Sequence, residues 1–373
     1  MISRLEIMPL SFHSSRRLTL ETAKTPATVN LAGVRTDFKS LAVQYPLPEG
    51  WSGITVVEDT FLADHVQVRR AGLSSTSPSG EEILGSAADA RGSPTARAYF
   101  ELLERASTVE WLARPRALCD LLTIDGTVAE QSSWKDVFPE SPEPAAWRYA
   151  RSNGVAIHAD WQSASERAFW ELCERDRVLR TWYGETVPQR VAFAVEETPL
   201  ATSRSYEWRA FSFPESARKR FSRGVHVRGV FGMPRSREVP FVFGYGARPS
   251  EEEALSVATR EATQLLAFLW GEPLPEKEPP LAPTPAYHLE AFQWSERQEN
   301  VRDWLGGGHA RYRSASWPPR DVDGRVFFVD LTPPWISDLR VSKALCAEAV
   351  PLTFGDYPGA FHLPPAIRVH PIA

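Results

Sequence analysis

Two short segments of the chain repeat one pattern of charged residues. Residues 101–105 (ELLER) and 171–175 (ELCER) share the form E-L-x-E-R. In an α-helix, residues three and four apart lie on one face, so each segment would place two carboxylates and a guanidinium on a single patch. Mg²⁺ prefers oxygen ligands and combines a few carboxylates with the phosphates of a substrate. The repeat therefore indicates a site that gathers carboxylates around metal ions.

Carboxylates that converge in this way repel one another unless cations lie between them. Mg²⁺ together with Arg105 or Arg175 would relieve that repulsion, and a nucleoside triphosphate would then be held through metal ions and arginines rather than through a glycine-rich loop. The alternative is that both helices expose solvated faces crossed by Glu–Arg pairs, each worth about 0.3–0.5 kcal/mol. The spacing alone leaves both interpretations open.

The helices that would carry these residues can be placed from their expected N-terminal caps. Ser93 precedes Pro94, and Ser163 and Ser250 are each followed three residues later by a glutamate, which is typical of a capping box. Helices are accordingly predicted over about 94–114, 164–183 and 250–270.

Counting from these serines aligns the three predicted helices. Eleven residues beyond each serine stands a glutamate, at Glu104, Glu174 and Glu261. The count predicts that Glu261 takes the frame of Glu104 and Glu174, and that Ala258 stands where the other two helices carry their first glutamate. Each helix also follows a glycine-containing segment, at 85–90, 153–158 and 241–246. The sequence thus predicts an α/β (α+β) fold with a threefold strand–turn–helix quasi-repeat.

Bulk properties exclude several classes of protein. The chain has 373 residues, 43% of them hydrophobic, which is enough for a sizeable core. Its net charge of −5 argues against a nucleic-acid-binding surface. Cys119, Cys173 and Cys346 are far apart and form no CxxC, so neither a disulfide framework nor a zinc site is expected. The chain shows no signal peptide and no run of about 20 apolar residues, and a cytoplasmic protein without membrane contact is predicted.

The organisation along the chain predicts one large domain. Residues 1–50 are expected to form an arm or strand region, and 51–373 a catalytic domain. The proline-rich stretch 271–286 is expected to be an extended connector inside that domain. Short strands are predicted at 54–57, 66–68, 189–195 and 326–334, a loop at 73–80, and a hairpin from 223–231 and 239–245.

The motifs together resemble those of the YcaO superfamily, ATP-dependent enzymes that modify peptide backbones. The resemblance runs from about Gly85 to the C-terminus and rests on four segments of the chain. These are A-Y-F-E-L-L-E-R at 98–105, S-N-G-V-A at 152–156 with A-F-W-E-L-C-E-R-D at 168–176, F-G at 243–244 leading to Glu261 and Gln264, and V-D-L-T at 329–332.

The resemblance implies an ATP site built from the three helices. It implies metal-linked carboxylates at Glu101, Glu104, Glu171, Glu174 and Glu261. It places Arg105 and Arg175 near phosphate as catalytic residues, and Asn153 and Gln264 among the residues that bind the nucleotide. Azoline-forming relatives often end in a proline-alternating tail that reaches the active site, and His370-Pro371 at the end of this chain partly resembles it.

The implied chemistry is activation of a backbone amide. A nucleophile adds to the carbonyl carbon, the oxyanion takes the γ-phosphoryl group of ATP, and phosphate leaves. A neighbouring Cys, Ser or Thr side chain gives an azoline, external sulfide gives a thioamide, and an amine gives an amidine. Such phosphoryl transfer needs mostly positioning and neutralisation of charge. Cyclodehydration in a ribosomally made precursor peptide is the expected activity, with thioamide or amidine formation as the alternative.

The resemblance has limits that bear on partners. The glycine- and lysine-rich approach to the first motif is replaced here by Gly85-Ser-Ala-Ala-Asp89-Ala-Arg91-Gly92. No domain for leader-peptide binding is visible, which implies an E1-like partner protein that binds the leader; a homodimer is a further assembly to test. Two other hypotheses stay open: a catalytically idle scaffold of the same fold, and an unrelated α/β protein whose Glu–Arg helices are surface.

Overall fold

The computed structural model describes residues 18–19, 36–114, 117–141, 146–216, 221–312, 324–357 and 364–373. Three antiparallel sheets and one two-stranded ribbon form its framework, with strand orders β1-β2-β3-β4, β12-β11-β10-β9, β6-β5-β13-β14-β8 and β15-β7. The strands are β1 Leu18–Thr19, β2 Thr55–Ala63, β3 Val66–Thr76, β4 Glu82–Asp89, β5 Leu118–Leu122, β6 Val128–Ser133, β7 Trp147–Tyr149, β8 Val155–His158, β9 Gln189–Val191, β10 Tyr206–Ser212, β11 His226–Pro234, β12 Val242–Arg248, β13 Phe327–Asp330, β14 Arg340–Leu345 and β15 Thr353–Gly355.

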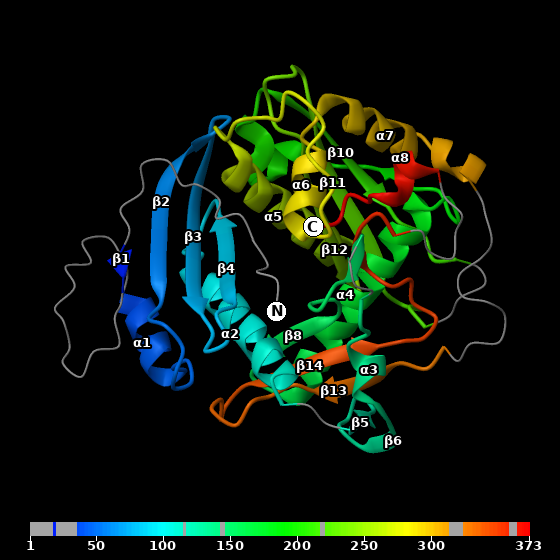
Figure 1. Cartoon of the computed structure of the whole chain (residues 1–373). Helices are drawn as coiled ribbons and strands as arrows, with labels where there is room; N and C mark the ends of the chain where they lie inside the picture. The colour runs from blue at the N-terminus through cyan, green and yellow to red at the C-terminus, as the bar shows by residue number, and fades with distance from the viewer. Residues whose placement is uncertain are drawn as a thin grey trace.

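One long helix covers each of the three sheets. α2 packs on β3 and β4, α4 on β8 and β14, and α5 on β11 and β12. Figure 1 shows α2 crossing between the β2–β4 sheet and the β13–β14–β8 sheet, with α5 above it. The helices are α1 Thr36–Gln44, α2 Thr95–Leu112, α3 Trp134–Val137, α4 Trp161–Trp182, α5 Glu251–Leu269, α6 Pro285–Ala291, α7 Ser295–Leu305 and α8 Pro365–Arg368, with 3₁₀ turns at Val195–Glu197, Pro199–Thr202 and Gly308–Tyr312.

Two of the long helices, α2 and α5, make a close approach to a glycine of the sheet that they cover. A Cβ atom added to Gly85 of β4 would stand 2.0 Å from the Ala98 carbonyl oxygen of α2. One added to Gly244 of β12 would stand 2.2 Å from the Ala262 nitrogen of α5. Real Cβ atoms do not come so close, so glycine sets the distance between helix and strand at both places.

The N-termini of the first two helices differ from those that the sequence predicts. Asp160, not Ser163, caps α4, because its carboxylate accepts a hydrogen bond of 2.8 Å from the Ser163 nitrogen. The N-cap position of α2 is Pro94, with no side-chain cap, so α2 begins at Thr95. Ser250 does cap α5 as predicted, accepting from the Glu253 nitrogen at 3.2 Å.

The strand predictions were correct in type but not in length: β2 and β3 are longer than predicted, whereas β9 and β13 are shorter. The hairpin of β11 and β12 is confirmed as an antiparallel pair, and β13 lies within the strand predicted at 326–334. The predicted loop at 73–80 was wrong in its first part, because β3 continues to Thr76 against β4. The glycine-containing segment at 85–90 lies largely in strand β4 rather than in a turn. Residues 271–284 form neither helix nor strand, as predicted, but the last two residues of the predicted connector 271–286 belong to helix α6.

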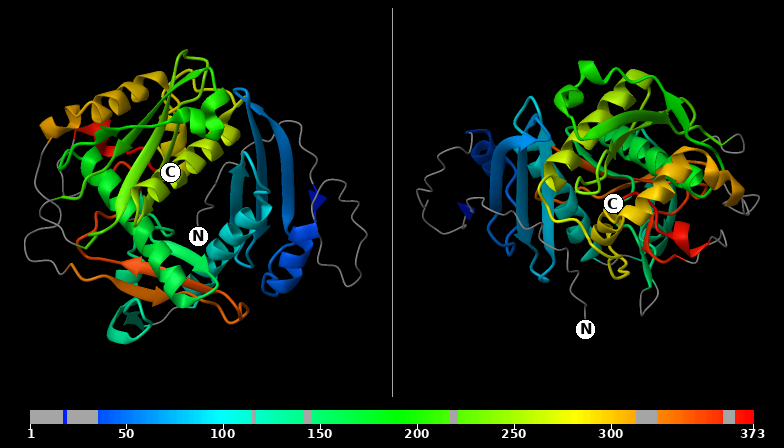
Figure 2. Two further views of the ribbon diagram at one scale, coloured as in Figure 1. Left: turned by 180° about the vertical axis from the view of Figure 1, so that it is seen from behind. Right: turned by 90° about the horizontal axis from the view of Figure 1, so that it is seen from above.

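The described part of residues 1–50 packs against the rest of the chain. Phe38 of α1 is 1% exposed and meets the Tyr99 ring of α2 edge-on, with centroids 5.5 Å apart. The Tyr99 hydroxyl also donates to the Tyr45 carbonyl oxygen at 2.5 Å. Figure 2 shows α1 beside the β2–β4 sheet in both further views. A domain boundary at residue 50 stays a prediction.

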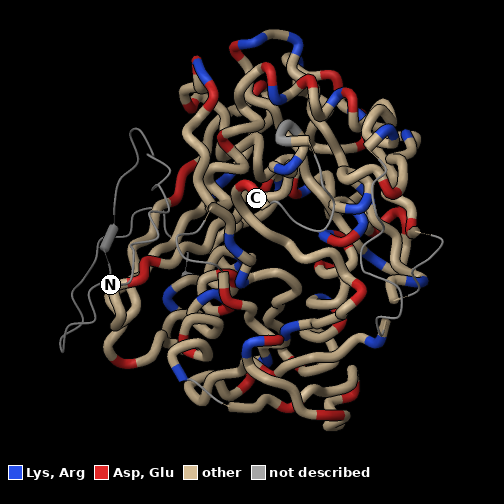
Figure 3. Tube along the Cα trace, turned by 45° about the vertical axis from the view of Figure 1, so that its right-hand side comes forward, with Lys and Arg blue, Asp and Glu red and all other residues tan. Residues whose placement is uncertain are grey.

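Charge distribution and helix hydropathy are two features of the whole molecule. Lys and Arg positions alternate with Asp and Glu positions over the face shown in Figure 3, without a single-sign stripe of the kind that tracks nucleic acid. None of the helices in the described ranges combines the length and apolar character that a membrane span requires.

Candidate functional site

The glycine contacts give the correct alignment of the three helices. Gly85 faces Ala98, Gly154 faces Ala168, and Gly244 faces Ala258. Three residues after each of these alanines stands a glutamate. The equivalent positions are therefore Glu101, Glu171 and Glu261.

The alignment of α5 with the other two helices that was predicted by counting from the serines was thus wrong by three residues. Glu261 corresponds to the first glutamate of each E-L-x-E-R segment, not to the second, and Ala258 corresponds to Ala98 and Ala168. The count failed because α2 and α4 do not start at the serines used for it. In α5 the position of Glu104 and Glu174 is taken by Gln264. The exact three-unit repeat is not confirmed, because strand order differs among the sheets.

The first glutamates are fixed by backbone donors of their own sheets. Glu101 accepts a hydrogen bond from the Ser86 nitrogen at 2.8 Å, and Glu171 accepts one from the Gly154 nitrogen at 3.2 Å. Both donors lie at the glycine contacts. The contact that brings helix and sheet together therefore also places the carboxylate.

In α2 and α5 the second position reaches toward a different sheet. Glu104 of α2 accepts from the Ile157 nitrogen of β8 at 3.1 Å. Gln264 of α5 accepts from the Ala88 nitrogen of β4 at 3.3 Å. Ile157 and Ala88 each lie three residues after the glycine of their own sheet. These two bonds tie α2 to the β8 sheet and α5 to the β4 sheet, which holds the three helices around one centre.

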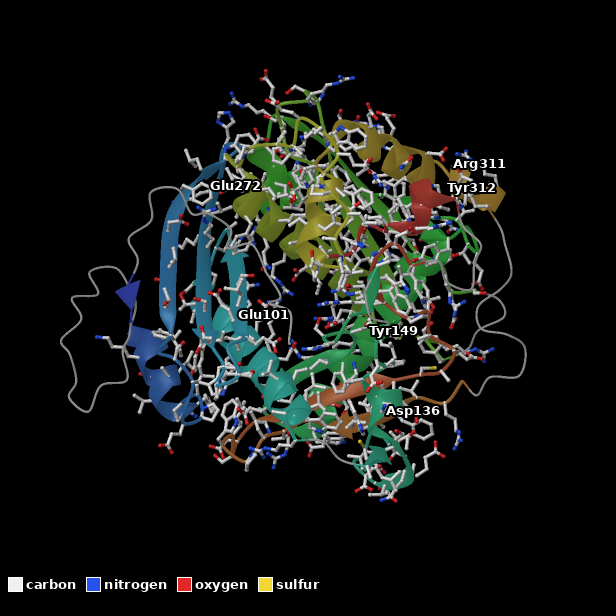
Figure 4. The ribbon with its side chains drawn as sticks, in the orientation of Figure 1. Glu101, Asp136, Tyr149, Glu272, Arg311 and Tyr312 are labelled. Atoms are coloured by element: carbon white, nitrogen blue, oxygen red, sulfur yellow. The ribbon has the colours of Figure 1, made fainter. Side chains whose placement is uncertain are left out.

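The predicted site residues of the three helices and of the turn before β8 lie at the border between core and solvent, whereas the predicted tail residues His370 and Pro371 are buried. Their side chains are partly exposed, whereas the next residues along each helix, such as Leu102, Leu172 and Ala262, are buried. Figure 4 labels Glu101 on α2. The partly exposed residues are Glu101, Glu104, Arg105, Asn153, Glu171, Glu174, Arg175, Glu261 and Gln264.

The carboxylates are close enough to raise one another's pKa. Burial, then Glu171, then Glu101 hold the pKa of Glu104 well above its ordinary value. Burial raises the pKa of Glu174 to about 7, with Glu171 and Glu261 adding to the rise against Arg175. The pKa values of Glu171 and Glu261 are also raised, in each case by burial first and by Glu101 in addition. Five carboxylates of three helices thus share one electrostatic environment that favours added cations.

The two arginines of the motif are already paired with these carboxylates. Arg105 donates to Glu101 at 2.5 Å along α2, and Arg175 lies 3.2 Å from Glu174. Burial lowers the pKa of Arg175, but Glu174, Glu171 and Glu261 together raise it above its ordinary value. The Nε atom of Arg175 is buried and has no hydrogen-bond partner among the described residues. It remains available to an anion.

Asn153 lies in the turn before β8, beside Glu171. Its Oδ1 atom is buried without a hydrogen-bond partner in the described part of the chain. A buried polar atom of this kind costs stability unless something else bonds to it, so the turn presents an amide to an absent group.

Lys343 of β14 is a site residue that the sequence analysis missed. Its side chain is 4% exposed, and Nζ donates to the Asn153 carbonyl oxygen at 2.7 Å and to the Arg151 carbonyl oxygen at 3.4 Å. Burial lowers the pKa of Lys343 to about 8, while the charge of Glu171 acts in the opposite direction. A lysine between small and apolar residues in the segment V-S-K-A-L was the available signal.

The C-terminal tail meets the site through Tyr245. The Tyr245 hydroxyl donates to the Pro371 carbonyl oxygen at 3.0 Å, and Tyr245 also interacts electrostatically with Arg175 and Glu174. His370 is fully buried, with Nε2 donating to the Thr353 carbonyl oxygen at 2.6 Å and Nδ1 accepting from the Ile372 nitrogen at 3.3 Å. Burial lowers the pKa of His370 to about 4. Both ring nitrogens are engaged, so His370 anchors the tail as a neutral side chain.

The donor set suits Mg²⁺ bound together with phosphates. Among the described residues, no group of three or more His, Cys, Asp or Glu side chains is arranged to hold a metal ion on its own. Mg²⁺ is ordinarily held by one or two carboxylates, with waters and substrate phosphates as the other ligands. Carboxylates with raised pKa values around an unpartnered amide and a free guanidinium nitrogen fit that arrangement.

Comparison with known proteins agrees with this chemistry. The family model described as YcaO cyclodehydratase, ATP- and Mg²⁺-binding, matches residues 131–349, which is more than half of the chain. No curated protein matches the chain. A solved structure of YcaO from Methanopyrus kandleri, bound with AMPPCP and Mg²⁺, is 18% identical, with 84% of this chain and 88% of that chain covered and a TM-score of 0.55.

A second solved structure has a similar fold. It is the E. coli microcin synthetase McbBCD complex with pro-MccB17 bound, and it is 12% identical. The match covers 79% of this chain and 88% of that chain, with a TM-score of 0.51. At such identities the likeness concerns the fold. The family model assigns the family and the cofactors: this chain belongs to the YcaO cyclodehydratase family, and its cofactors are ATP and Mg²⁺.

Proposed function

We propose that this protein activates backbone amides of a ribosomally made precursor peptide with ATP and closes Cys, Ser or Thr side chains into azolines. The observation that carries the proposal is the set of five carboxylates with shared electrostatics, one of which, Glu171, accepts a hydrogen bond from the turn that holds the unpartnered Asn153 Oδ1 atom. A surface lined by Glu–Arg pairs would have no reason to bring carboxylates of three helices together at this cost. The set is what a Mg²⁺–nucleotide site requires.

In the proposed reaction, the side-chain nucleophile adds to the preceding carbonyl carbon. The resulting oxyanion takes the γ-phosphoryl group of ATP, ADP departs, and the phosphate then leaves with the former amide oxygen as the ring forms. The net change in the peptide is the loss of one water per residue cyclised. Bound Mg²⁺ would neutralise charge on the phosphates during this transfer.

The chain's own residues have defined parts in the proposal. Glu101, Glu104, Glu171, Glu174 and Glu261 would hold the metal ions, and Asn153 and Gln264 would contact the nucleotide. Arg105 and Arg175 would balance charge near the transferred phosphoryl group. His370 and Pro371 would act by position, because their backbone and ring atoms fasten the tail beside Tyr245.

The peptide and its partner are part of the proposal. The McbBCD structure contains several chains and a bound pro-peptide. By analogy, a leader-binding E1-like protein would bring the precursor peptide to this chain. A homodimer is the second assembly that a measurement of mass in solution would distinguish. Cytoplasmic localisation follows from the same proposal, because ATP and a newly made precursor peptide are both found there.

The first test is a thermal shift with ATP plus Mg²⁺ against each ligand alone, on wild type and Glu174→Gln. Ligand that binds the folded state raises Tm by mass action. The proposal expects a rise that needs both ligands and is lost in Glu174→Gln. No rise in the wild type, alone and with the partner protein present, would leave the idle scaffold as the better description.

The second test identifies the product. Precursor peptide, partner protein, ATP and Mg²⁺ are incubated with the enzyme, and the peptide is analysed by mass spectrometry. Azoline formation removes one water per modified residue, whereas thioamide formation replaces oxygen by sulfur and amidine formation joins an amine. A product of the latter two kinds would reassign the reaction while keeping the same amide activation.

A further inference from the structure

Three aromatic side chains form a partly exposed group on the ribbon of β7 and β15. Trp147 and Tyr149 stand two residues apart on β7, so their side chains share one face of the ribbon. The Trp147 ring meets the Tyr149 ring edge-on, with centroids 5.0 Å apart. It also meets the ring of Tyr357, two residues after β15, with centroids 4.5 Å apart. We call these three residues the aromatic patch.

The register of the ribbon turns the aromatic patch away from the core. Phe354 of β15 stands opposite Arg148, is 6% exposed and packs in a core cluster with Trp182. Residues directly opposite in an antiparallel pair share a face, so Trp147 and Tyr149 lie on the other face. All three patch residues keep part of their surface exposed. Aromatic side chains that contact one another at a surface, rather than standing singly, are typical of an interaction site.

The backbone under the aromatic patch is held from two sides. β15 pairs with β7 along one edge, and two buried imidazoles bond to its other edge. The Gly355 nitrogen donates to His288 Nε2 at 2.9 Å, and His370 Nε2 donates to the Thr353 carbonyl oxygen at 2.6 Å. A surface held in this way is formed before a ligand arrives, so binding to it costs little additional ordering.

The aromatic patch adjoins the candidate site along the chain. Tyr149, which Figure 4 labels, stands four residues before Asn153, so their Cα atoms are at most about 15 Å apart. The segment between them is fixed, because the Ala150 nitrogen donates to the Leu352 carbonyl oxygen at 2.9 Å and Lys343 Nζ donates to the Asn153 carbonyl oxygen at 2.7 Å. An extended peptide rises about 3.4 Å per residue, so a peptide with its reacting amide beside Asn153 can reach the patch within about five residues.

We propose that the aromatic patch binds an extended, uncharged segment of the precursor peptide, with apolar or proline side chains, within about five residues of the activated amide. The inference rests on the proposed function and deepens it. Trp and Tyr rings accept the proline and apolar side chains of extended peptides. These rings carry no charge at neutral pH, and the nearby Asp356 carboxylate is already paired with Arg368 at 3.1 Å. The patch therefore favours uncharged residues over charged ones.

The test measures the binding of two fluorescently labelled synthetic peptides to the full chain by anisotropy. In the first, about five residues of alternating Leu and Pro stand on each side of one Cys, and in the second Ser and Gly replace them. The main variant is Tyr149→Ser/Tyr357→Ser, and Tyr149→Phe/Tyr357→Phe keeps the rings. The matched control is Tyr312→Ser, at a partly exposed tyrosine that Figure 4 labels apart from Tyr149.

Wild type should bind the Leu–Pro peptide about tenfold more tightly than the Ser–Gly peptide, as expected when one apolar side chain is buried on the rings. In Tyr149→Ser/Tyr357→Ser this preference should fall to within about twofold, whereas the Phe variant and Tyr312→Ser keep it. The Tm rise with Mg²⁺–ATP should persist in every variant, because none of these residues holds the nucleotide. A preference that survives in the double Ser variant, or that is lost equally in Tyr312→Ser, overturns the inference. If the double Ser variant does not fold, the single substitution Tyr357→Ser, outside both strands, is judged by the same criterion.

The Tm rise of wild type with Mg²⁺–ATP separates failure of this inference from failure of the proposed function. A wild type with the Tm rise but without the peptide preference would overturn the inference alone. A wild type with the preference but without the Tm rise, alone and with the partner protein, would overturn the proposed function and leave the aromatic patch as the peptide site of a scaffold. Absence of both would overturn both.

Discussion

At the scale of single residues, Glu174 links the site to the stability of the fold. Its side chain is 12% exposed, and burial raises its pKa to about 7. Below about pH 4.5 the group is protonated in both the folded and the unfolded chain. Between pH 4.5 and 7 the unfolded chain loses this proton first, so the contribution of the group to folding stability falls as pH rises through its folded pKa.

Glu174→Gln mimics the protonated form at every pH. Between pH 5 and pH 8, the free energy of unfolding of the variant should rise by about 1–3 kcal/mol relative to that of wild type. Urea unfolding of both proteins at the two pH values measures this difference. Glu207→Gln on the exposed face of β10 serves as the control and should show no such gain. A relative stability of Glu174→Gln that does not change with pH would contradict the shared-charge environment.

Lys343 should tune nucleotide affinity through the turn that carries Asn153. Its Nζ atom donates to the Asn153 carbonyl oxygen, and its charge faces Glu171. Because burial lowers its pKa to about 8, the charge is lost as pH rises through that value. The affinity of wild type for Mg²⁺–ATP should therefore fall between pH 7 and 9.5.

Two substitutions separate charge from packing at this position. Lys343→Met should bind Mg²⁺–ATP about tenfold more weakly at pH 7 and show a flatter pH profile. Lys343→Arg keeps its charge throughout this range, so its profile should be flat with part of the affinity retained. Calorimetric titrations across the pH range give both quantities. A wild-type profile as flat as that of Lys343→Met would show that the lysine has only a structural part.

At the scale of elements, the glycine contacts decide where the carboxylates stand. A Cβ on Gly244 would meet the backbone of α5 at Ala258 and Ala262, and the nearby Glu261 carbonyl carbon at 2.7 Å. Gly244→Ala should push α5 from β12, cost about 1–3 kcal/mol of folding stability and abolish the Tm rise with Mg²⁺–ATP. The matched control is Gly92→Ala, whose Cβ would find only Asp89, at 3.8 Å. Thermal melts of both variants, with and without Mg²⁺–ATP, measure these changes. Equal Tm values and equal Tm rises for the two variants would contradict the alignment.

The glycine contacts also explain which parts of the site could be predicted from the sequence. The spacing E-L-x-E-R placed Glu101, Glu104, Glu171 and Glu174 on helix faces, because helical periodicity is a local property. The alignment of Glu261 depended on where helices begin, and local capping signals misled it at α4, where Asp160 caps instead of Ser163. The true alignment is set by the approach of helix to strand, a tertiary contact that no count along one segment contains.

Site residues outside the motifs were missed for a related reason. Lys343 and Arg248 stand in strands far along the chain from the glutamates they face. Their roles follow from sheet register and from the packing of α4 and α5, not from spacing within a motif. The sequence analysis predicted no strand at 340–345, and the pairing that brings Lys343 opposite Val155 could not be predicted from either segment alone.

At the scale of the whole molecule, the site depends on residues before position 51. α2 carries Glu101 and Glu104 on one face, and its opposite face packs on Phe38 and Tyr45. A change in the first 50 residues should therefore reach the nucleotide site through the position of α2. The predicted domain boundary at residue 50 implies instead that residues 51–373 form a complete catalytic unit.

Two proteins distinguish these claims. Phe38→Ala in the full chain removes a side chain that is 1% exposed, and should cost about 3–5 kcal/mol of folding stability in urea unfolding. The piece 51–373 lacks Phe38 and Tyr45, which contact Tyr99 of α2, so it should melt at a lower temperature and lose the Tm rise with Mg²⁺–ATP. Val43→Ala, at a side chain 82% exposed on the same helix α1, should change neither quantity. If 51–373 keeps both the Tm and the ligand response of the full chain, the boundary holds and α1 is dispensable for the site.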